Sequence, residues 1–320
     1  MLVRGLDIPG VGVTMSESSP PDLVNSRSVG VVGVGAMGGA IANRLADQGW
    51  SVFIFDTNSA TYANVEAESI VPCGSVSELA RSCDVVLTCL PSANASLIVG
   101  RQISDVCRPT VLVEMSTVGP ETLHRLADIL APSGVGLLDA PISGGARRLK
   151  EGAAAIVVSG SPAVVDLTRP LLEAVSRQIV IAGPNPGDAQ ICKLVNNAIS
   201  FTAFVASCEA MAVGVKAGIR AKALLEFVNM GSGRNSATTD KIPHAIMPRT
   251  FHGGGQLGAV TKDLDLYLDI ARQSGMPELM VHNTRRIWQD AVANLGFDVD
   301  YTRFAEFMEG QVGAMIVDAD

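Results

Sequence analysis

The stretch SVGVVGVGAMGGAIANRLADQGWSVFIFD, residues Ser28 to Asp56, decides the fold of this chain of 320 residues. A short apolar run typical of a β-strand ends at Gly33, and the pattern Gly33-x-Gly35-x-x-Gly38 follows it. A stretch with helical periodicity comes next, and a second apolar run closes on Asp56. Because strand, glycine-rich turn, helix, strand and acid occur in this order, the stretch predicts a dinucleotide-binding fold.

The glycines of this pattern have separate physical roles. They allow a tight turn, a close approach of the backbone to a pyrophosphate, and close packing of helix on strand. The pyrophosphate would lie on a helix N-terminus, where free amides and the helix dipole favour negative charge. We therefore expect cofactor contacts from four residues of this turn, which are Gly33, Gly35, Met37 and Gly38.

The acid that ends the second apolar run indicates which dinucleotide binds. Asp56 can accept hydrogen bonds from both hydroxyls of an adenosine ribose, which favours NAD. The residues that follow, Thr57-Asn58-Ser59, offer no Arg or Lys for a 2′-phosphate. NADP is therefore the less expected cofactor.

Apolar runs alternate with helical patterns through the rest of the first half. The runs cover residues 84–89, 110–115, 136–139, 154–159 and 179–182, and helical patterns cover 121–130 and 162–175. This alternation predicts an α/β fold with an open, mostly parallel, doubly wound sheet over residues 28–187.

Three loops fall beyond the carboxyl ends of these runs, where ligands bind to such sheets. They are Leu90-Pro91 with Asn94, Ser116-Thr117, and Ser143-Gly144-Gly145, which is followed by Arg147, Arg148 and Lys150. Each loop could equally be the ordinary turn chemistry of a strand-to-helix connection. The serine and two glycines form the best candidate for an anion cradle, because successive amides and a hydroxyl can point at one oxygen.

A proline-free, Ala-, Val- and Ile-rich stretch over residues 187–218 predicts one long helix. It is apolar nearly all round, so we expect burial on several sides, and the Gly187-Asp188 turn can cap its first amides. Lys193 and Asn197 break the apolar pattern four residues apart, so they share one face. The lysine could simply reach outward to water, and Asn197 could cap or bond a neighbouring loop. Alternatively, burial lowers the pKa of the lysine enough for proton transfer.

The second half is helical. We expect helices at 221–230, 257–273, 277–295 and 301–315, and hence an all-helical domain over residues 188–320 that starts with the long helix. Lys262 and Asp269 lie seven residues apart on one helical face, where Asp269 either steers Lys262 or the substrate, or forms a solvated surface ion pair. The four histidines, at 124, 244, 252 and 282, show no metal-binding spacing.

Composition narrows the class of protein. The net charge of −8 argues against nucleic acid as a partner, and we find no uncharged apolar run long enough for a membrane span. The six cysteines show no paired spacing, which fits reduced thiols and a cytoplasmic location. Residues 1–27 contain prolines among Ser, Gly and Asp, so we expect a poorly ordered tail, and Met15 could be the biological start.

Taken together, these motifs resemble the β-hydroxyacid dehydrogenase family, which includes 3-hydroxyisobutyrate dehydrogenase and tartronate semialdehyde reductase, with 6-phosphogluconate dehydrogenase as a distant relative. The matching segments run in the family's order and cover nearly the whole chain: VGVVGVGAMGGAIA, the Leu90-Pro91 loop, EMSTVGPETLHRLA, DAPISGGARRLKEG, GDAQICKLVNN and TKDLDLYLDIA.

The resemblance implies roles for these positions and an association of subunits. Lys193 would be the general acid/base, and Asn197 with Ser143, Gly144 and Gly145 would bind a small anionic hydroxy acid. Leu90, Pro91, Asn94 and Thr117 would line the cofactor, and Lys262 would reach the nicotinamide end. The helical half would associate with a second subunit in a homodimer or homotetramer.

Three departures from the family concern the helix start and the substrate's side group. Ala189 stands where many members have glycine, Ser236 replaces a common tryptophan, and Gly255 replaces a phenylalanine. The last two changes would enlarge or rehydrate the pocket. They leave the reaction type intact and leave open which β-hydroxy acid is used.

Two other functions compete with a dehydrogenase. An imine-type reductase could use the same scaffold, although such enzymes typically lack the lysine found at Lys193. A dinucleotide-sensing protein without chemistry of its own would keep the nucleotide site alone. Retention of Lys193, Asn197 and the Ser143-Gly144-Gly145 turn argues against the sensor.

Overall fold

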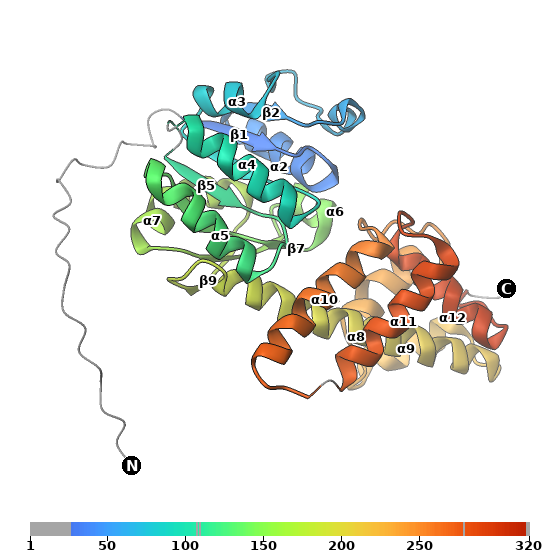
Figure 1. Cartoon of the computed structure of the whole chain (residues 1–320). Coiled ribbons are helices and arrows are strands. Elements are labelled where there is room, and N and C mark those ends of the chain that lie inside the picture. The colour runs from blue at the N-terminus through green and yellow to red at the C-terminus, as the bar shows by residue number, and fades with distance from the viewer. Residues whose placement is uncertain (1–26, 107, 109, 278, 318–320) are drawn as a thin grey trace, which may run out of the picture.

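The computed structural model describes residues 27–106, 108, 110–277 and 279–317. An α/β domain and a helical domain are joined by the long helix α8 (Asp188–Lys216), which starts under the sheet and runs into the helical domain (Figure 1). The expected N-terminal tail, apart from Arg27, and the alternative start at Met15 lie outside the described residues.

The α/β domain is built on one sheet, which has nine strands in the described part of the chain. They are β1 (Ser28–Val32), β2 (Ser51–Phe55), β3 (Val71–Pro72), β4 (Val85–Thr88), β5 (Val111–Glu114), β6 (Gly136–Asp139), β7 (Ile142–Ser143), β8 (Ala155–Ser159) and β9 (Gln178–Gly183). Their order is β3-β2-β1-β4-β5-β6-β8-β7, with β9 paired to β8. The pairs from β3 to β6 are parallel, whereas β8 runs antiparallel to β6 and β7. The prediction of a mostly parallel sheet is confirmed.

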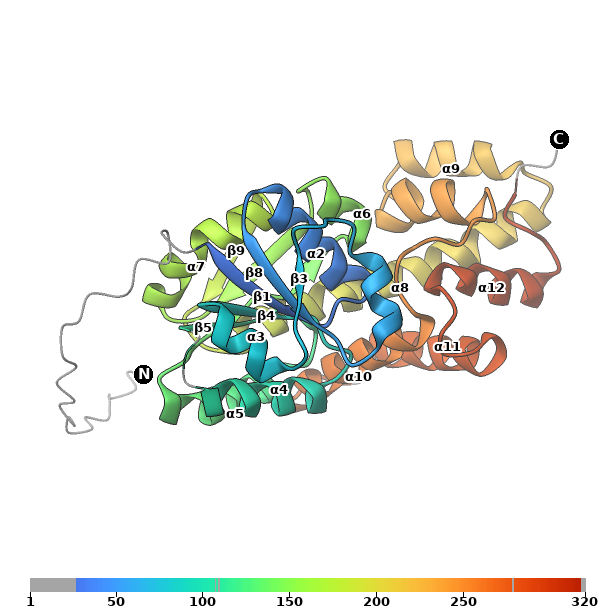
Figure 2. The same ribbon diagram turned by 90° about the horizontal axis from the view of Figure 1, so that it is seen from above.

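Helices cover both faces of this sheet (Figure 2). One apolar core joins the sheet to α2 (Ala36–Asp47), α6 (Gly145–Lys150) and α7 (Pro162–Val175). A second core joins its other face to α3 (Val76–Ser82), α4 (Ala93–Val106) and α5 (Pro120–Leu130). Single 3-10 turns, η1 (Ser59–Asn64) and η2 (Ala131–Ser133), complete the domain. Because the sheet is covered on both sides, β4 and β5 are buried at every residue, as their continuous apolar runs require.

The helical domain surrounds the distal part of α8. It contains α9 (Ala221–Met230), a π-helix η3 (Ala237–Ile246), α10 (Leu257–Gln273), α11 (Met280–Leu295), the 3-10 turn η4 (Tyr301–Arg303) and α12 (Phe304–Val312). Fully buried Trp288 and Phe304 pack with ring centroids 4.3 Å apart at the centre of its core. The last expected helix, 301–315, is divided into η4 and α12 and ends early, because Gly313 adopts a left-handed conformation with φ of 65°.

The first turn of α8 is capped differently from the sequence expectation. Asp188 bonds the amide of Asn185, outside the helix. The first amides of the helix are instead bonded from the sheet: Asp139 Oδ2 accepts from Gly187 N and Gln190 N at 3.1 Å each, and Ser159 Oγ accepts from Ala189 N at 3.0 Å. The strands β6 and β8 therefore hold the start of α8 directly.

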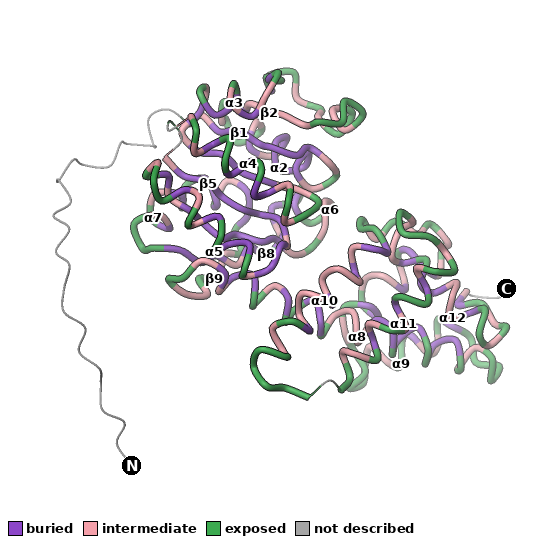
Figure 3. The backbone as a smooth tube through the Cα atoms, in the orientation of Figure 1, coloured by how far each residue is buried: buried purple, intermediate pink, exposed green. Residues whose placement is uncertain are grey.

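The expectation that α8 is buried on several sides is only partly met. Ile191, Val195 and Ile199 form a row at four-residue spacing that is 37%, 41% and 67% exposed. Figure 3 shows this mixture of buried and uncovered residues along the helix.

By length and composition α8 could also cross a membrane. From the sequence we expect no such span, because we count glycine and asparagine residues as interruptions. In this fold α8 packs against α10, α11 and α12 as the central helix of its domain.

Candidate active site

A cleft of about 1500 Å³ lies where the carboxyl edge of the sheet meets α8 and the helical domain. Its lining includes every site residue proposed from the sequence except Asn94 and Lys262: Gly33, Gly35, Met37, Gly38, Asp56, Leu90, Pro91, Thr117, Ser143, Gly144, Gly145, Lys193 and Asn197. Residues more than 150 positions apart in the chain thus share one cavity. A cavity of this size accommodates a dinucleotide together with a small substrate.

The nucleotide half of the cleft has the close backbone packing that the glycine pattern predicts. Gly33 has a φ of +88°, and a Cβ on Gly38 would lie 1.8 Å from Gly33 O. A Cβ on Gly35 would meet nothing within 4 Å, because this residue faces the open cleft at the start of α2. The turn therefore leaves an uncovered helix N-terminus that a pyrophosphate fits.

Asp56 lies at the end of β2 in the same half of the cleft. Its Oδ2 accepts from Val34 N at 2.9 Å and its Oδ1 from Asn58 N at 2.8 Å, so both carboxylate oxygens are held in place and keep further lone pairs. Among the described residues, Thr57, Asn58 and Thr61 line the cleft beside it, and neither Lys nor Arg does. This lining fits the ribose hydroxyls of NAD and lacks a partner for a 2′-phosphate.

Two loops that the sequence places at strand ends are tied to each other. Ser116 Oγ accepts from Leu90 N at 2.7 Å, and Ser116 N donates to Glu114 Oε1 at 2.9 Å. Glu114 is fully buried, and burial raises the pKa of its carboxyl. Ser116 therefore links the β4–α4 loop to the β5–α5 loop, on which Leu90 and Thr117 line the cleft.

Lys193 projects from the second turn of α8 into the cleft, with part of its side chain buried. Its pKa is lowered to about 8, chiefly by burial. The carboxylate of Asp263 opposes this shift, and the ammonium of Lys262 adds to it. An amine with such a pKa can exchange a proton near neutral pH, which an exposed lysine cannot.

A chain of polar contacts orients the residues around Lys193. Asn197 Nδ2 donates to Asp263 Oδ2 at 2.7 Å, and Asn196 Nδ2 donates to Asn197 Oδ1 at 3.2 Å and to Ser143 Oγ at 3.4 Å. Ser143 ends β7, and Gly144 and Gly145 begin α6 with φ values of +126° and +71°. The Ser143-Gly144-Gly145 cradle, Asn197 and Lys193 therefore face one part of the cleft.

The two sequence candidates outside the lining have clear positions. Asn94 is exposed on the first turn of α4. Lys262 Nζ donates to Thr117 O at 2.6 Å and lies 3.3 Å from Asp263 Oδ1, so it links α10 to the β5–α5 loop behind the cleft surface. Asp269 forms an exposed ion pair with Arg272 at 3.0 Å, which is the surface alternative considered for it.

Gln190 is a buried residue at the start of α8 that the sequence does not single out. It is fully buried on the first turn of α8, one turn before Lys193. Its Nε2 donates to Ser116 O at 3.0 Å and Asp139 Oδ1 at 2.8 Å, and its Oε1 accepts from Val118 N at 2.9 Å and Gly119 N at 3.0 Å. The side chain thereby sets the position of α8, and of Lys193, relative to the sheet.

We expect Gln190→Met to lower kcat by about tenfold while the Kd for NADH stays unchanged, because Lys193 shifts relative to the nicotinamide end of the cleft. The Tm should also fall, since four polar partners lose a bond inside the protein. Gln48→Met, at an exposed position after α2, is the matched control. A lower Tm with an unaltered kcat, measured well below the Tm, would make Gln190 a structural residue only.

Two departures from the family pattern, Gly255 and Ser236, both line the cleft. The ring of Tyr301 lies 3.4 Å from the place of a Cβ on Gly255, so it occupies part of the space that a larger residue there would take. Ser236 Oγ lies 3.3 Å from Ser200 Oγ of α8. The pocket expected to be enlarged is therefore partly filled, and it is polar.

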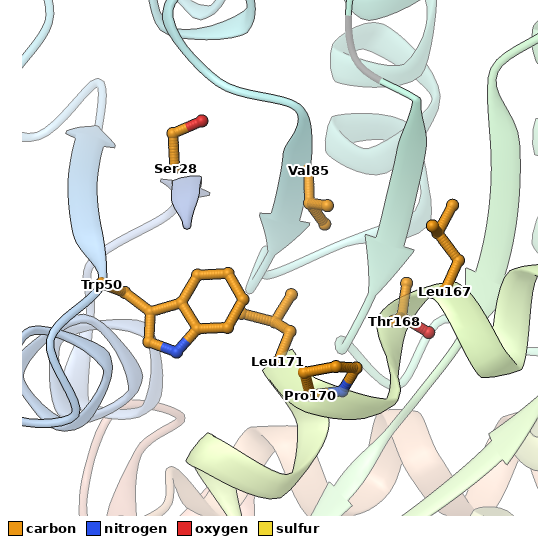
Figure 4. Close-up of a pocket in the computed structure, with 7 residues that line it drawn as sticks. All are labelled: Ser28, Trp50, Val85, Leu167, Thr168, Pro170 and Leu171. Carbon is orange, nitrogen blue, oxygen red and sulfur yellow. The ribbon is translucent and has the colours of Figure 1, made fainter. Parts of the chain in front are cut away.

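A second cavity lies under the opposite end of the sheet (Figure 4). It is lined by Ser28, Trp50, Val85, Leu167, Thr168, Pro170 and Leu171. Its volume of about 10 Å³ holds at most about one water molecule, so it offers no room for a substrate.

Comparison with known families divides the chain as the fold does. Residues 28–183 match the model of the NAD binding domain of 6-phosphogluconate dehydrogenase. Residues 187–308 match the family described as NAD-binding of NADP-dependent 3-hydroxyisobutyrate dehydrogenase. The boundary between the two matches falls between β9 and α8.

Individual relatives extend over most of the chain. The 2-(hydroxymethyl)glutarate dehydrogenase of Eubacterium barkeri is 31% identical over 268 residues, which are 82% of this chain and 89% of the relative. The L-threonate dehydrogenase of Cupriavidus necator is 32% identical over 256 residues, 79% of this chain and 86% of the relative. Both are dehydrogenases by name, and their names specify different hydroxy acids.

Solved structures share the fold. A 3-hydroxyisobutyrate dehydrogenase from Salmonella typhimurium is similar with a TM-score of 0.80 at 24% identity, over 88% of this chain and 99% of that one. An imine reductase from Streptomyces aurantiacus is more distant, with a TM-score of 0.61 at 19% identity, over 88% of this chain and 99% of that one. The chain therefore belongs to the β-hydroxyacid dehydrogenase family and is an NAD-dependent oxidoreductase that acts on the CH–OH group of small hydroxy acids.

Proposed function

We propose that this enzyme oxidises a small β-hydroxy acid to its semialdehyde or keto acid, with Lys193 as the general base. The observation that carries the proposal is the position of Lys193. Its amine, with a pKa lowered to about 8, lines the same cleft as the glycine turn and the Ser143-Gly144-Gly145 cradle. An amine, an anion cradle and a nucleotide site in one cavity are the parts that this oxidation requires.

The residues around Lys193 divide the work between binding and proton transfer. The Ser143 hydroxyl, the amides of Gly144 and Gly145, and the Asn197 amide would bind the substrate carboxylate and orient its hydroxyl. Bound NAD supplies the hydride acceptor. Lys193 Nζ would take the hydroxyl proton as the hydride leaves, and would return a proton when the reaction runs in reverse.

The charges around Lys193 set the pH range in which its amine can accept or donate a proton. Burial and Lys262 disfavour the protonated amine, and Asp263 keeps the pKa from falling further. Since only the free amine accepts a proton, oxidation should slow as the pH falls below about 8. Reduction needs the protonated amine, so it should slow as the pH rises above this value.

We expect NADH absorbance to appear when the enzyme and NAD receive a hydroxy acid from a panel of serine, threonate, glycerate and 3-hydroxyisobutyrate. For the best substrate, kcat/KM for oxidation should rise with pH and level off above about 8, which reports the Lys193 amine. Its profile for reduction should fall over the same range. The range from about pH 6 to about pH 10 covers about two pH units on either side of the Lys193 pKa. A turnover that stays constant over this range would exclude this lysine as the base.

Two alternative functions separate in the same assay. A dinucleotide sensor would bind NADH and give no substrate-dependent absorbance change at any pH. An imine reductase would consume reduced cofactor with cyclic imines and ignore hydroxy acids. The Lys193, Asn197 and Ser143 constellation favours the hydroxy acid.

We also propose that copies of this chain associate as a homodimer or homotetramer. The exposed row Ile191, Val195 and Ile199 on α8 supports this proposal, as do Phe227 and Met230 of α9, which are 75% and 74% exposed. Apolar groups of this size rarely remain in water together. Light scattering on the purified protein gives the number of copies.

A further inference from the structure

We propose that the substrate's side group carries a second carboxylate, which binds to Arg148 and Lys241 at the far end of the cleft. This inference rests on the proposed function, because it names the class of β-hydroxy acid that the Lys193 site oxidises. We define the far end by five lining residues: Arg148, Ser236, Asp240, Lys241 and Tyr301.

The far end adjoins the anion cradle. Arg148 follows the cradle on α6, and its Cβ and Cδ lie 3.3 and 3.4 Å from the place of a Cβ on Gly144. A Cβ on Gly145 would lie 3.9 Å from Gly253 O, in the loop that precedes α10. Arg148 and the loop that precedes α10 therefore adjoin the cradle, so a side group of a substrate whose first carboxylate lies in the cradle can reach Arg148.

Positive charge exceeds negative charge at this end. Arg147 Nη2 binds Asp240 Oδ1 at 2.7 Å, and Lys241 Nζ lies 3.5 Å from Asp240 Oδ2. The Arg148 guanidinium makes no hydrogen bond or ion pair with any described residue, and Arg148 lines the cleft. The far end therefore has two cations in its lining, Arg148 and Lys241, and one carboxylate, Asp240, which is already paired with Arg147 outside the lining. The Lys241 side chain is only 21% exposed. A partly desolvated ammonium with one long ion contact leaves room for a further anion.

The other polar groups at this end donate hydrogen bonds. Tyr301 lines the cleft, and the pKa of its hydroxyl is raised by burial and by the carboxylates of Asp300 and Asp240, so the hydroxyl stays protonated. Ser236 presents a second hydroxyl. A methyl side group would offer no acceptor to the Tyr301 hydroxyl or to the two cations, whereas a carboxylate accepts from several donors at once.

A matched pair of substrates tests the charge directly. We would compare kcat/KM for 2-(hydroxymethyl)glutarate with that for the same molecule bearing a neutral amide in place of its side-chain carboxylate. The wild-type enzyme should prefer the dicarboxylate by about tenfold or more. In Arg148→Gln and in Lys241→Gln this preference should collapse toward one. Lys150→Gln is the matched control, because Lys150 lies on the same helix and binds Glu66 outside the cleft.

The outcomes separate this inference from the proposed function. Equal kcat/KM for the acid and the amide in the wild type would overturn the second-carboxylate site while the dehydrogenase assignment stands. An equal fall in kcat/KM for both substrates in Arg148→Gln and Lys241→Gln would also overturn it, because these cations would then not distinguish a charged side group from a neutral one. If no β-hydroxy acid reduces NAD at all, the proposed function itself fails.

Discussion

Lys193→Ala should lower kcat for oxidation by about 10³-fold, because proton transfer by a positioned side chain contributes two to four orders of magnitude. The lysine lies on α8, whereas the glycine turn and Asp56 lie in the first β–α–β unit of the sheet. The Kd for NADH, measured by fluorescence titration, should therefore stay unchanged. The pH dependence near 8 should disappear together with the amine that causes it.

The control for this variant is Lys216→Ala, at the other end of the same helix, where the amine lies 3.5 Å from Gly313 O. That variant should retain wild-type kcat. If Lys193→Ala kept a kcat close to that of the wild type, another group would have to take the hydroxyl proton. The assignment of Lys193 as the base would then be wrong.

Gly35→Val should weaken NAD binding by about a hundredfold or more, because a side chain there enters the space that the pyrophosphate needs at the start of α2. The backbone of Gly35 has a φ of −59° and needs no glycine, and a Cβ would meet no atom within 4 Å. The variant should therefore fold with an unchanged Tm. Calorimetric titration with NADH measures the loss of affinity.

Gly310→Val is the matched control, since Gly310 is exposed on α12 and a Cβ there also meets nothing within 4 Å. It should bind NADH like the wild type. By contrast, Gly38→Val should fail to fold stably, because its Cβ would lie 1.8 Å from Gly33 O. Normal NADH affinity in Gly35→Val would mean that the dinucleotide does not lie on this helix N-terminus.

Much of the α/β domain is predictable because its signals are local. The central strands are continuous apolar runs, and the first β–α–β unit has its glycines at fixed spacing. The strands β3 and β7, of two residues each, carry no such signal, because they exist only through pairing with β2 and β8. The π-helix η3 contains Pro243 and is set by packing against α8 and α9, which the local sequence does not encode.

The residues of the site also fall into those that the sequence indicates and those that only the fold brings to the site. Lys193 and Asn197 stand out as polar residues in an apolar helix, so the sequence alone indicates them. Asp263 and Gln190 do not stand out, because an aspartate beside Lys262 and a glutamine near a helix start are ordinary surface residues by pattern. Their connection to the site comes from hydrogen bonds to residues 66 to 74 positions away along the chain. The adjacent pair Lys262-Asp263 lies on α10, which packs against α8, the helix of Lys193. This pair is the sequence signal that could have indicated Asp263.

The start of α8 shows how contacts from elsewhere in the fold replace the local cap that the sequence predicts. Asp188 has the residue type and position of a helix cap, yet its carboxylate bonds Asn185. The buried Asp139, from the end of β6, binds the helix amides instead. A tertiary hydrogen bond of this kind fixes the helix to the sheet, and a local cap cannot do so.

The most direct test of the central claim is a crystal structure of the enzyme with NAD and a non-reacting β-hydroxy acid analogue. We expect Lys193 Nζ within about 3 Å of the analogue's hydroxyl oxygen, on the carbon that faces the nicotinamide C4. The analogue's first carboxylate should lie in the Ser143-Gly144-Gly145 cradle. A Lys193 amine that points into bulk water, out of contact with analogue and nicotinamide, would contradict the account.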